Sequence, residues 1–178
     1  MARISKVLFL VMVFPLLFGC ANQFGSVSYV NLTSTFVPKD AEHVLGDGAN
    51  SISGSALIRR NDGMVVTCAG IGVSLVPATT YANERMAAIY QSNTSAYKPV
   101  FGSKQIVFSP DSFEYSHMIR EAFCDARGEF SFKNVTDGTY YVTTQVTWKS
   151  SPYVVEGGYL MKKIRVYGGQ SVNIVLTP

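Results

Sequence analysis

The stretch DARGEFSFKNVTDGTYYVTTQVTW, residues 125–148, decides the fold. Phe130 and Phe132 alternate with polar residues, and residues 140–148 continue the same alternation over a longer span. A period of two is typical of a β-strand with one buried face, whereas a helix would scatter these side chains around its circumference. Asp137-Gly138, between the two runs, has the composition of a tight turn. The stretch therefore predicts a β-hairpin with both phenylalanine rings pointing inward.

The same period recurs on either side of this hairpin. Further strands are predicted at residues 52–59, 64–68, 71–75, 160–167 and 171–177, with Asn61-Asp62-Gly63 as a hairpin turn between the first two. The chain has 178 residues, of which 47% are hydrophobic and only 15% charged. That composition suits a single domain with a substantial apolar core.

Three segments together resemble a known family. They are ISGSALIRRNDGMVVTCAGIGVSLVP (52–77), DARGEFSFKNVTDGTYYV (125–142) and IRVYGGQSVNIVLTP (164–178). Their glycine-containing first strand, Asp-Gly turn, D-x-x-G-x-F-x-F motif and closing glycine-rich turn resemble the carboxypeptidase regulatory-like domain, which is related to prealbumin-like and Cna-B-like modules. The resemblance implies an all-β, antiparallel Ig/prealbumin-like β-sandwich of about seven strands. These motifs specify architecture and do not identify an activity.

Residues 1–19 have the pattern of a secretory signal peptide. Arg3 and Lys6 precede twelve apolar residues, 7–18, which are too few to cross a bilayer as a helix. No later segment is long and apolar enough to span a membrane.

The end of the signal, Leu17-Phe18-Gly19-Cys20, resembles the bacterial lipobox, although Phe18 stands where a smaller residue is usual. The resemblance implies a lipoprotein whose Cys20 carries diacylglycerol and palmitate. Ala21 implies sorting to the bacterial outer membrane, with the domain facing the periplasm or the cell surface. The alternative is plain secretion, with Cys20 incidental.

Cys68 and Cys124 remain once Cys20 is assigned to the lipid. An even number of cysteines in an oxidising compartment predicts a disulfide between them. The alternative is a pair of buried free thiols. A metal site is disfavoured because neither cysteine has a second Cys or His at ligand spacing.

Two regions fall outside the strand pattern. Residues 20–51 are rich in Asn, Ser, Thr and Gly, and we interpret them as a lipidated tether, although 27–29 and 35–37 can pair as an edge strand and 38–45 can form a helical turn. Residues 77–123 form an insertion in the 52–178 domain. It contains a predicted helix at 80–91, a strand at 105–108 and a segment, 115–124, that we assign to strand over helix.

Composition and motifs disfavour several function classes. Removing the signal takes Arg3 and Lys6 from the 15 basic residues, which leaves the chain near neutral against its 12 acidic residues. This argues against a nucleic-acid partner. His43 and His117 lie in unrelated contexts and no catalytic motif is present, so we predict no enzyme, no cofactor and no metal site.

We therefore expect a non-enzymatic, lipid-anchored module of the cell envelope that binds a protein partner or assists assembly. The alternative is a carbohydrate-binding module, because Trp148, Tyr153 and Tyr159 flank a predicted mobile loop at 149–159. Aromatic side chains of this kind can stack on sugar rings, although they are also ordinary packing at a sheet edge.

Overall fold

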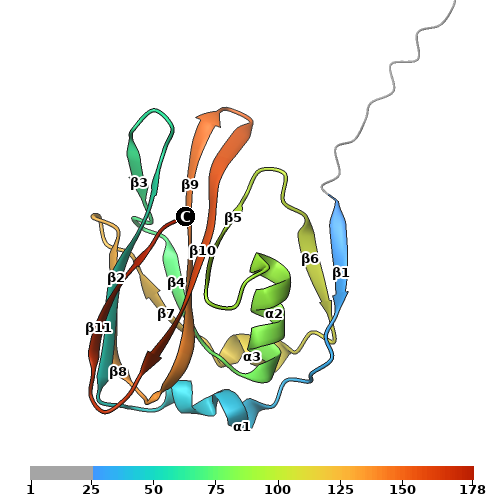
Figure 1. Cartoon of the computed structure of the whole chain (residues 1–178), viewed down its shortest axis with the longest axis vertical. Helices are drawn as coiled ribbons and strands as arrows, with labels where there is room; N and C mark the ends of the chain where they lie inside the picture. The colour runs from blue at the N-terminus through green and yellow to red at the C-terminus, as the bar shows by residue number, and fades with distance from the viewer. Residues whose placement is uncertain (1–25) are drawn as a thin grey trace, which may run out of the picture.

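A computed structural model describes residues 26–178 as two β-sheets packed face to face and a separate two-stranded sheet, with α2 (Thr80–Tyr90) and α3 (Phe113–His117) on one outer side and α1 (Pro38–Ala41) across one end (Figure 1). The larger sheet has the strand order β5-β10-β9-β4-β7. In the smaller sheet β2 is central, with β11 on one side and β3 and β8 on the other. The strands of the two sheets are β2 (Asn50–Arg59), β3 (Val65–Thr67), β4 (Gly72–Pro77), β5 (Ser95–Pro99), β7 (Arg120–Phe123), β8 (Glu129–Val135), β9 (Gly138–Ser151), β10 (Val154–Val166) and β11 (Ser171–Leu176).

The main core lies between the two sheets and is built from the alternation read in the sequence. Phe130 and Phe132 of β8 are both buried there, as predicted, and their rings meet edge to face. Tyr140, Val142 and Val146 of β9 are fully buried in the same core. The β-sandwich is therefore confirmed.

The topology differs from the expectation in strand number and direction. The described residues form eleven strands, four more than expected. Two pairs are parallel: β11 with β2, and β1 (Val27–Asn31) with β6 (Gln105–Ser109). Alternation predicts which residues form a strand, but not the direction of its partner, and this accounts for the difference in direction. The four additional strands lie outside the segments that carry the resemblance: β1 is in residues 20–51, and β5, β6 and β7 are in residues 77–123.

A second apolar cluster covers the outer face of the larger sheet. Tyr141 and Met161 contribute from β9 and β10, and α2 (Thr80–Tyr90), confirmed where a helix was predicted, packs against them with Tyr81 and Met86. Thr79 caps this helix by accepting a hydrogen bond from the Ala82 N–H at 3.1 Å. The larger sheet is consequently buried on both faces.

Arg85 of α2 lies against several aromatic rings of this second cluster. Its guanidinium carbon lies 4.0 Å from the ring centre of Phe108 and 4.9 Å from that of Tyr115. Its Nη1 pairs with Asp111 at 2.6 Å. Aromatic faces and a carboxylate together compensate the charge for its loss of water.

The segment expected to be a tether is folded onto the domain from Val27 onward. β1 pairs with β6, and the chain continues through the helical turns α1 (Pro38–Ala41) and η1 (Glu42–Leu45). Leu32 and Val44 are buried, which gives the segment apolar anchors that its polar composition obscured. Cys20 and the signal peptide lie outside the described residues.

Residues 77–123, which we predicted to be an insertion, supply both edges of the larger sheet. β5 pairs with β10 at one edge and β7 with β4 at the other. The predicted strand at 115–124 is partly wrong, because α3 (Phe113–His117) occupies its first half and only β7 is extended. Tyr115 lies between the rings of Phe36 and Tyr81, at 5.5 and 5.2 Å, and this tertiary contact favours the helical turn.

The prediction of a mobile loop at 149–159 is also wrong. β9 extends to Ser151 and β10 begins at Val154, so the two form one long antiparallel hairpin with a short turn. Glycines at 157 and 158 suggested a loop, but both are buried in the hairpin at close backbone approaches.

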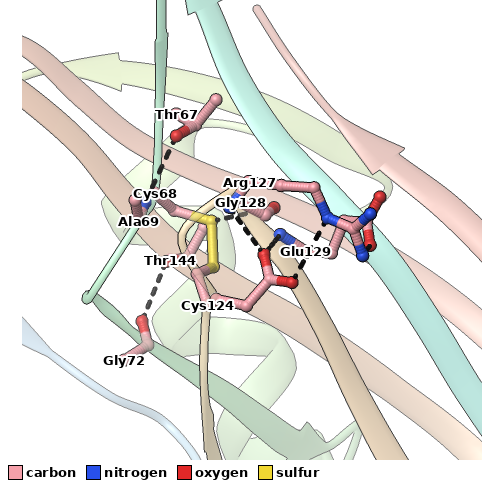
Figure 2. Close-up of a disulfide and its surroundings, with 10 residues drawn as sticks. Thr67, Cys68, Ala69, Gly72, Cys124, Arg127, Gly128, Glu129 and Thr144 are labelled. Carbon is pink, nitrogen blue, oxygen red and sulfur yellow. Dashed lines mark hydrogen bonds and ion pairs between the residues drawn. A yellow bond between two sulfur atoms is a disulfide. The ribbon is translucent and has the colours of Figure 1, made fainter.

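A disulfide joins Cys68 and Cys124, as predicted (Figure 2). Cys68 directly follows β3 of the smaller sheet and Cys124 directly follows β7 of the larger one, so the bond links the two layers. The backbone N–H of Cys68 donates to Ala56 O at 3.1 Å, and that of Cys124 donates to Ile71 O at 2.9 Å. Both half-cystines are thus fixed by backbone bonds as well.

Replacing both half-cystines tests what this link contributes. The bond closes a loop with a sequence separation of 56. In the chain-entropy model, Cys68→Ala/Cys124→Ala should lower the free energy of unfolding by about 4 kcal/mol. Urea denaturation followed by far-ultraviolet circular dichroism measures the change, and reduced wild type should behave like the double variant. Equal midpoints for oxidised wild type and the variant would contradict the prediction.

Buried tyrosines predict a loss of stability at alkaline pH. Burial raises the pKa of Tyr115 to about 12, whereas tyrosine in an unfolded chain ionises near pH 10. The native state therefore keeps a proton that the unfolded chain releases, and the free energy of unfolding falls as pH rises from about 10 to about 12. Tyr115→Phe should reduce this fall by up to roughly 3 kcal/mol. Urea midpoints of the two proteins across this pH range, referenced to neutral pH, measure the difference; parallel curves would contradict it.

Candidate functional site

Three loops meet around a depression of about 510 Å³ at one end of the sandwich. The first loop follows β2, the second follows β5, and the third is the turn of the β9–β10 hairpin, and all three point toward the same end of the molecule in Figure 1. The depression is lined by Ile58, Arg59, Arg60, Asn61, Asp62, Tyr97, Pro99, Phe101, Trp148, Glu156, Gly157 and Pro178. Aromatic and charged side chains thus share one concave surface, which is the usual composition of a small-ligand site.

Trp148 is held in this depression by its partner across the hairpin. Trp148 and Glu156 are paired in register, and the indole Nε1 donates a hydrogen bond to Glu156 Oε2 at 3.1 Å. The Arg60 guanidinium carbon lies 5.5 Å from the centre of the Trp148 ring, and Arg60 also pairs with Asp62 at 2.8 Å. Indole, carboxylates and guanidinium therefore form one connected set.

Gly157 allows the indole to lie close to the hairpin backbone. Its φ is +93°, and a Cβ at this position would lie 2.1 Å from Val146 O and 2.9 Å from Cζ3 of Trp148. No other residue type fits both the left-handed backbone and the space available. The glycine is therefore part of what positions Trp148.

Tyr97 and Phe101 complete the aromatic wall from the insertion. The Tyr97 hydroxyl donates to Gly157 O at 3.0 Å, and burial together with the nearby Glu156 carboxylate raises the pKa of Tyr97. Its hydroxyl therefore stays protonated at neutral pH. Phe101, in contrast, is 72% exposed and leaves a ring face open to solvent.

This arrangement suits a ligand with both apolar and hydroxyl-bearing surfaces. A sugar ring presents C–H groups on its faces and hydroxyls at its edge. Phe101 and Trp148 offer apolar ring surface, and Arg60, Asp62 and Glu156 offer donors and acceptors around it. Such groups can bind and orient a saccharide without any covalent step.

The structure separates the three aromatic residues that the sequence singled out. Trp148 lies in the depression, whereas Tyr159 pairs with Gln145 in register and points to the opposite face of the larger sheet. There it lines a second, apolar groove with Tyr90 and Ile106. Tyr153, at the hairpin tip, is 96% exposed and lines neither.

Sequence reasoning missed Arg60, Tyr97 and Phe101 as neighbours of Trp148. Arg60 carries a weak local signal, since it precedes the Asn61-Asp62-Gly63 turn at the end of a predicted strand. The other two depend on β5 pairing with β10, a contact between distant parts of the chain that no local pattern encodes.

The remaining chemistry-bearing residues do not converge. His43 packs against the Tyr140 ring at 5.8 Å, and His117 packs against the Phe113 ring at 4.6 Å. Within residues 26–178, no group of three or more His, Cys, Asp or Glu is arranged to hold a metal ion. None of the helices in that range is long and apolar enough to cross a membrane.

Comparisons with known proteins show the fold. No protein-family model matches the chain, and no curated protein matches it. Among solved structures, the chain is similar to a Pseudomonas aeruginosa protein that is proposed to bind carbohydrate, with a TM-score of 0.67 and 24% identity over 82% of this chain and 99% of that one. Two variants of the shaft pilin SpaA of Lactobacillus rhamnosus GG match with TM-scores of 0.28 and 13% and 14% identity, over 72% of this chain and 45% of the pilin.

The role of Gly157 can be tested against a matched glycine. Gly157→Ala and Gly168→Ala both place a Cβ at positive φ, which costs about 1–2 kcal/mol. Nothing lies within 4 Å of the Cβ at Gly168, whereas the Cβ at Gly157 meets backbone. Gly157→Ala should therefore cost more than about 3 kcal/mol and shift the emission of the single tryptophan. Urea denaturation and fluorescence measure both effects; equal costs would contradict the close approach.

Proposed function

We propose that the protein is a non-enzymatic saccharide-binding module of the bacterial cell envelope, held at the membrane by lipid on Cys20. Its binding site is the depression lined by Trp148, Tyr97, Phe101 and Arg60. One observation carries this proposal: three aromatic side chains line the same concave surface as the carboxylates of Asp62 and Glu156 and the guanidinium of Arg60. Asp62 pairs with Arg60, and Glu156 accepts a hydrogen bond from Trp148. The likeness in fold to a protein proposed to bind carbohydrate supports it.

The anchor and the location rest on separate support. The lipobox-like Leu17-Phe18-Gly19-Cys20 supports acylation of Cys20, and Ala21 supports the outer membrane. The Cys68–Cys124 disulfide supports an oxidising compartment outside the cytoplasm. Mass spectrometry of the mature protein tests the acyl group directly.

A second candidate function is the capture of a protein partner by strand addition. β11 is the terminal strand of the smaller sheet and pairs only with β2 among the described residues. Its outer backbone edge is therefore free to pair with an extended segment, and Val175 on this strand is 47% exposed. Binding of this kind would not depend on Trp148, which distinguishes it from the saccharide site.

Saccharide binding should depend on the depression and not on the opposite face. Glycan arrays with the full-length mature protein identify a ligand, and calorimetry measures its affinity. Phe101→Ala should weaken binding about tenfold, because the exposed ring is lost without disturbing the core. Trp148→Ala should weaken it at least as much.

Tyr159→Ala provides the matched control, since Tyr159 lies on the other face of the same sheet. Its affinity should equal that of wild type. Loss of binding in Tyr159→Ala together with normal binding in Phe101→Ala would place the site in the groove of Tyr159 and overturn the assignment. Binding of no glycan, with capture of an extended peptide, would favour the strand-addition function.

A further inference from the structure

The three loops around the depression share a second property: each exposes one large apolar side chain at its tip. Met64 follows the β2–β3 turn, Phe101 lies between β5 and β6, and Tyr153 is at the β9–β10 turn, and they are 59%, 72% and 96% exposed. Val65 and Val155, beside the first and third, are 55% and 40% exposed. Apolar groups clustered at one end of a soluble domain mark a contact surface.

Each of the three loops also carries a cation near its apolar tip. Arg59, Lys104 and Lys149 occupy these positions, and all three are exposed. Two acidic groups line the depression: Asp62 pairs with Arg60 at 2.8 Å, and Glu156 accepts from the neutral Trp148 indole and so keeps its charge. Against this one carboxylate, Arg59, Lys104 and Lys149 give the end an excess of positive charge around its apolar tips, which suits a surface with an apolar interior and anionic head groups.

The start of the described chain lies at this same end. Val27 pairs with Gln105, the first residue of β6. Figure 1 shows the start of β1 beside the start of β6, just after the loop that joins β5 to β6. Residues 21–26 separate it from Cys20, so the Cα atom of Cys20 can be at most about 25 Å from that of Val27. The 14 residues of β9 alone span roughly 45 Å. The distance that the chain can span between Cys20 and Val27 is thus shorter than the length of the sandwich.

We propose that this end of the sandwich docks directly on an anionic lipid bilayer, with Met64, Phe101 and Tyr153 entering the interface and Arg59, Lys104 and Lys149 contacting head groups. The inference rests on the lipid anchor of the proposed function. Acyl chains and a basic-apolar protein surface are the two signals that together give stable attachment. Tyrosine at the most exposed position fits the preference of this side chain for the membrane interface.

Docking in this orientation also defines which saccharides the protein meets. The depression lies among the three loops and therefore faces the bilayer surface. Its ligands are then sugars carried at that surface, such as the head groups of glycolipids.

The single tryptophan provides a direct test, because Trp148 lies at this end. The acylated full-length mature protein, with acylation of Cys20 verified by mass spectrometry, is reconstituted into phosphatidylglycerol vesicles brominated near the head-group end of the acyl chains. Bromine quenches indole only at short range. We expect the Trp148 emission to fall about twofold relative to unbrominated vesicles, and this quenching to be largely lost in Phe101→Ser/Tyr153→Ser.

The matched control moves the reporter to the other end of the molecule. Trp148→Phe/Tyr167→Trp places the only tryptophan after β10, where Tyr167 is 57% exposed, and its emission should not change in brominated vesicles. An acylated wild-type protein without quenching, or equal quenching of both reporters, would overturn the docking proposal and leave the saccharide site untouched. Absence of an acyl group on Cys20 would instead remove the anchor itself, and with it this inference.

Discussion

The structure depends on the burial of both faces of β9. Tyr140 and Tyr141 are adjacent in the chain, point to opposite faces of the sheet, and are both fully buried. Burying a tyrosine requires a partner for its hydroxyl. The Tyr140 hydroxyl donates to Thr136 O at 3.0 Å, and that of Tyr141 donates to Asn83 Oδ1 on α2 at 2.6 Å. The second of these bonds fixes the helical layer to the sheet and so determines where the insertion must lie.

The length of β9 and β10 places the candidate site beyond this doubly covered region. β9 has 14 residues and β10 has 13, whereas β4 beside them has six. β4 pairs with β9 only from Tyr140 to Thr144, so the far end of the hairpin projects past β4. Trp148 and Glu156 form a cross-strand pair on that projection. A side chain there has neighbours on one side and solvent on the other, which is the condition for a binding site on a rigid element.

The sequence predicted the inner layer well because its signals are local. Alternating residues and Asp-Gly turns specified β2, β8 and β9, and the pairing of Cys68 with Cys124 followed from counting in an oxidising compartment. The positions of the outer segments, which contain α2, α3, β1 and β6, depend instead on contacts between residues far apart in the chain. Val27–Asn31 is a strand only because β6 lies beside it, and Tyr115 enters a helical turn because the rings of Phe36 and Tyr81 enclose it. The site was hard to predict for the same reason, since Trp148 comes from the hairpin whereas Tyr97 and Phe101 come from residues 77–123.

The β2–β3 hairpin connects the disulfide to the candidate site, because one end of it carries Cys68 and the other carries residues of the depression. β3 pairs with β2 over only three residue pairs, which is a short ladder for a strand at the edge of a sheet. Cys68, one residue past β3, is bonded across to the end of β7, so the base of this hairpin is held by both sheets. Arg60 and Asp62, which form one wall of the depression, are at its apex. Without the disulfide, that wall would be held by the pairing of β3 with β2 and by backbone hydrogen bonds from Cys68 to Ala56 and from Arg60 to Met64. The covalent link between the layers therefore orders the geometry around Trp148 as well as the core.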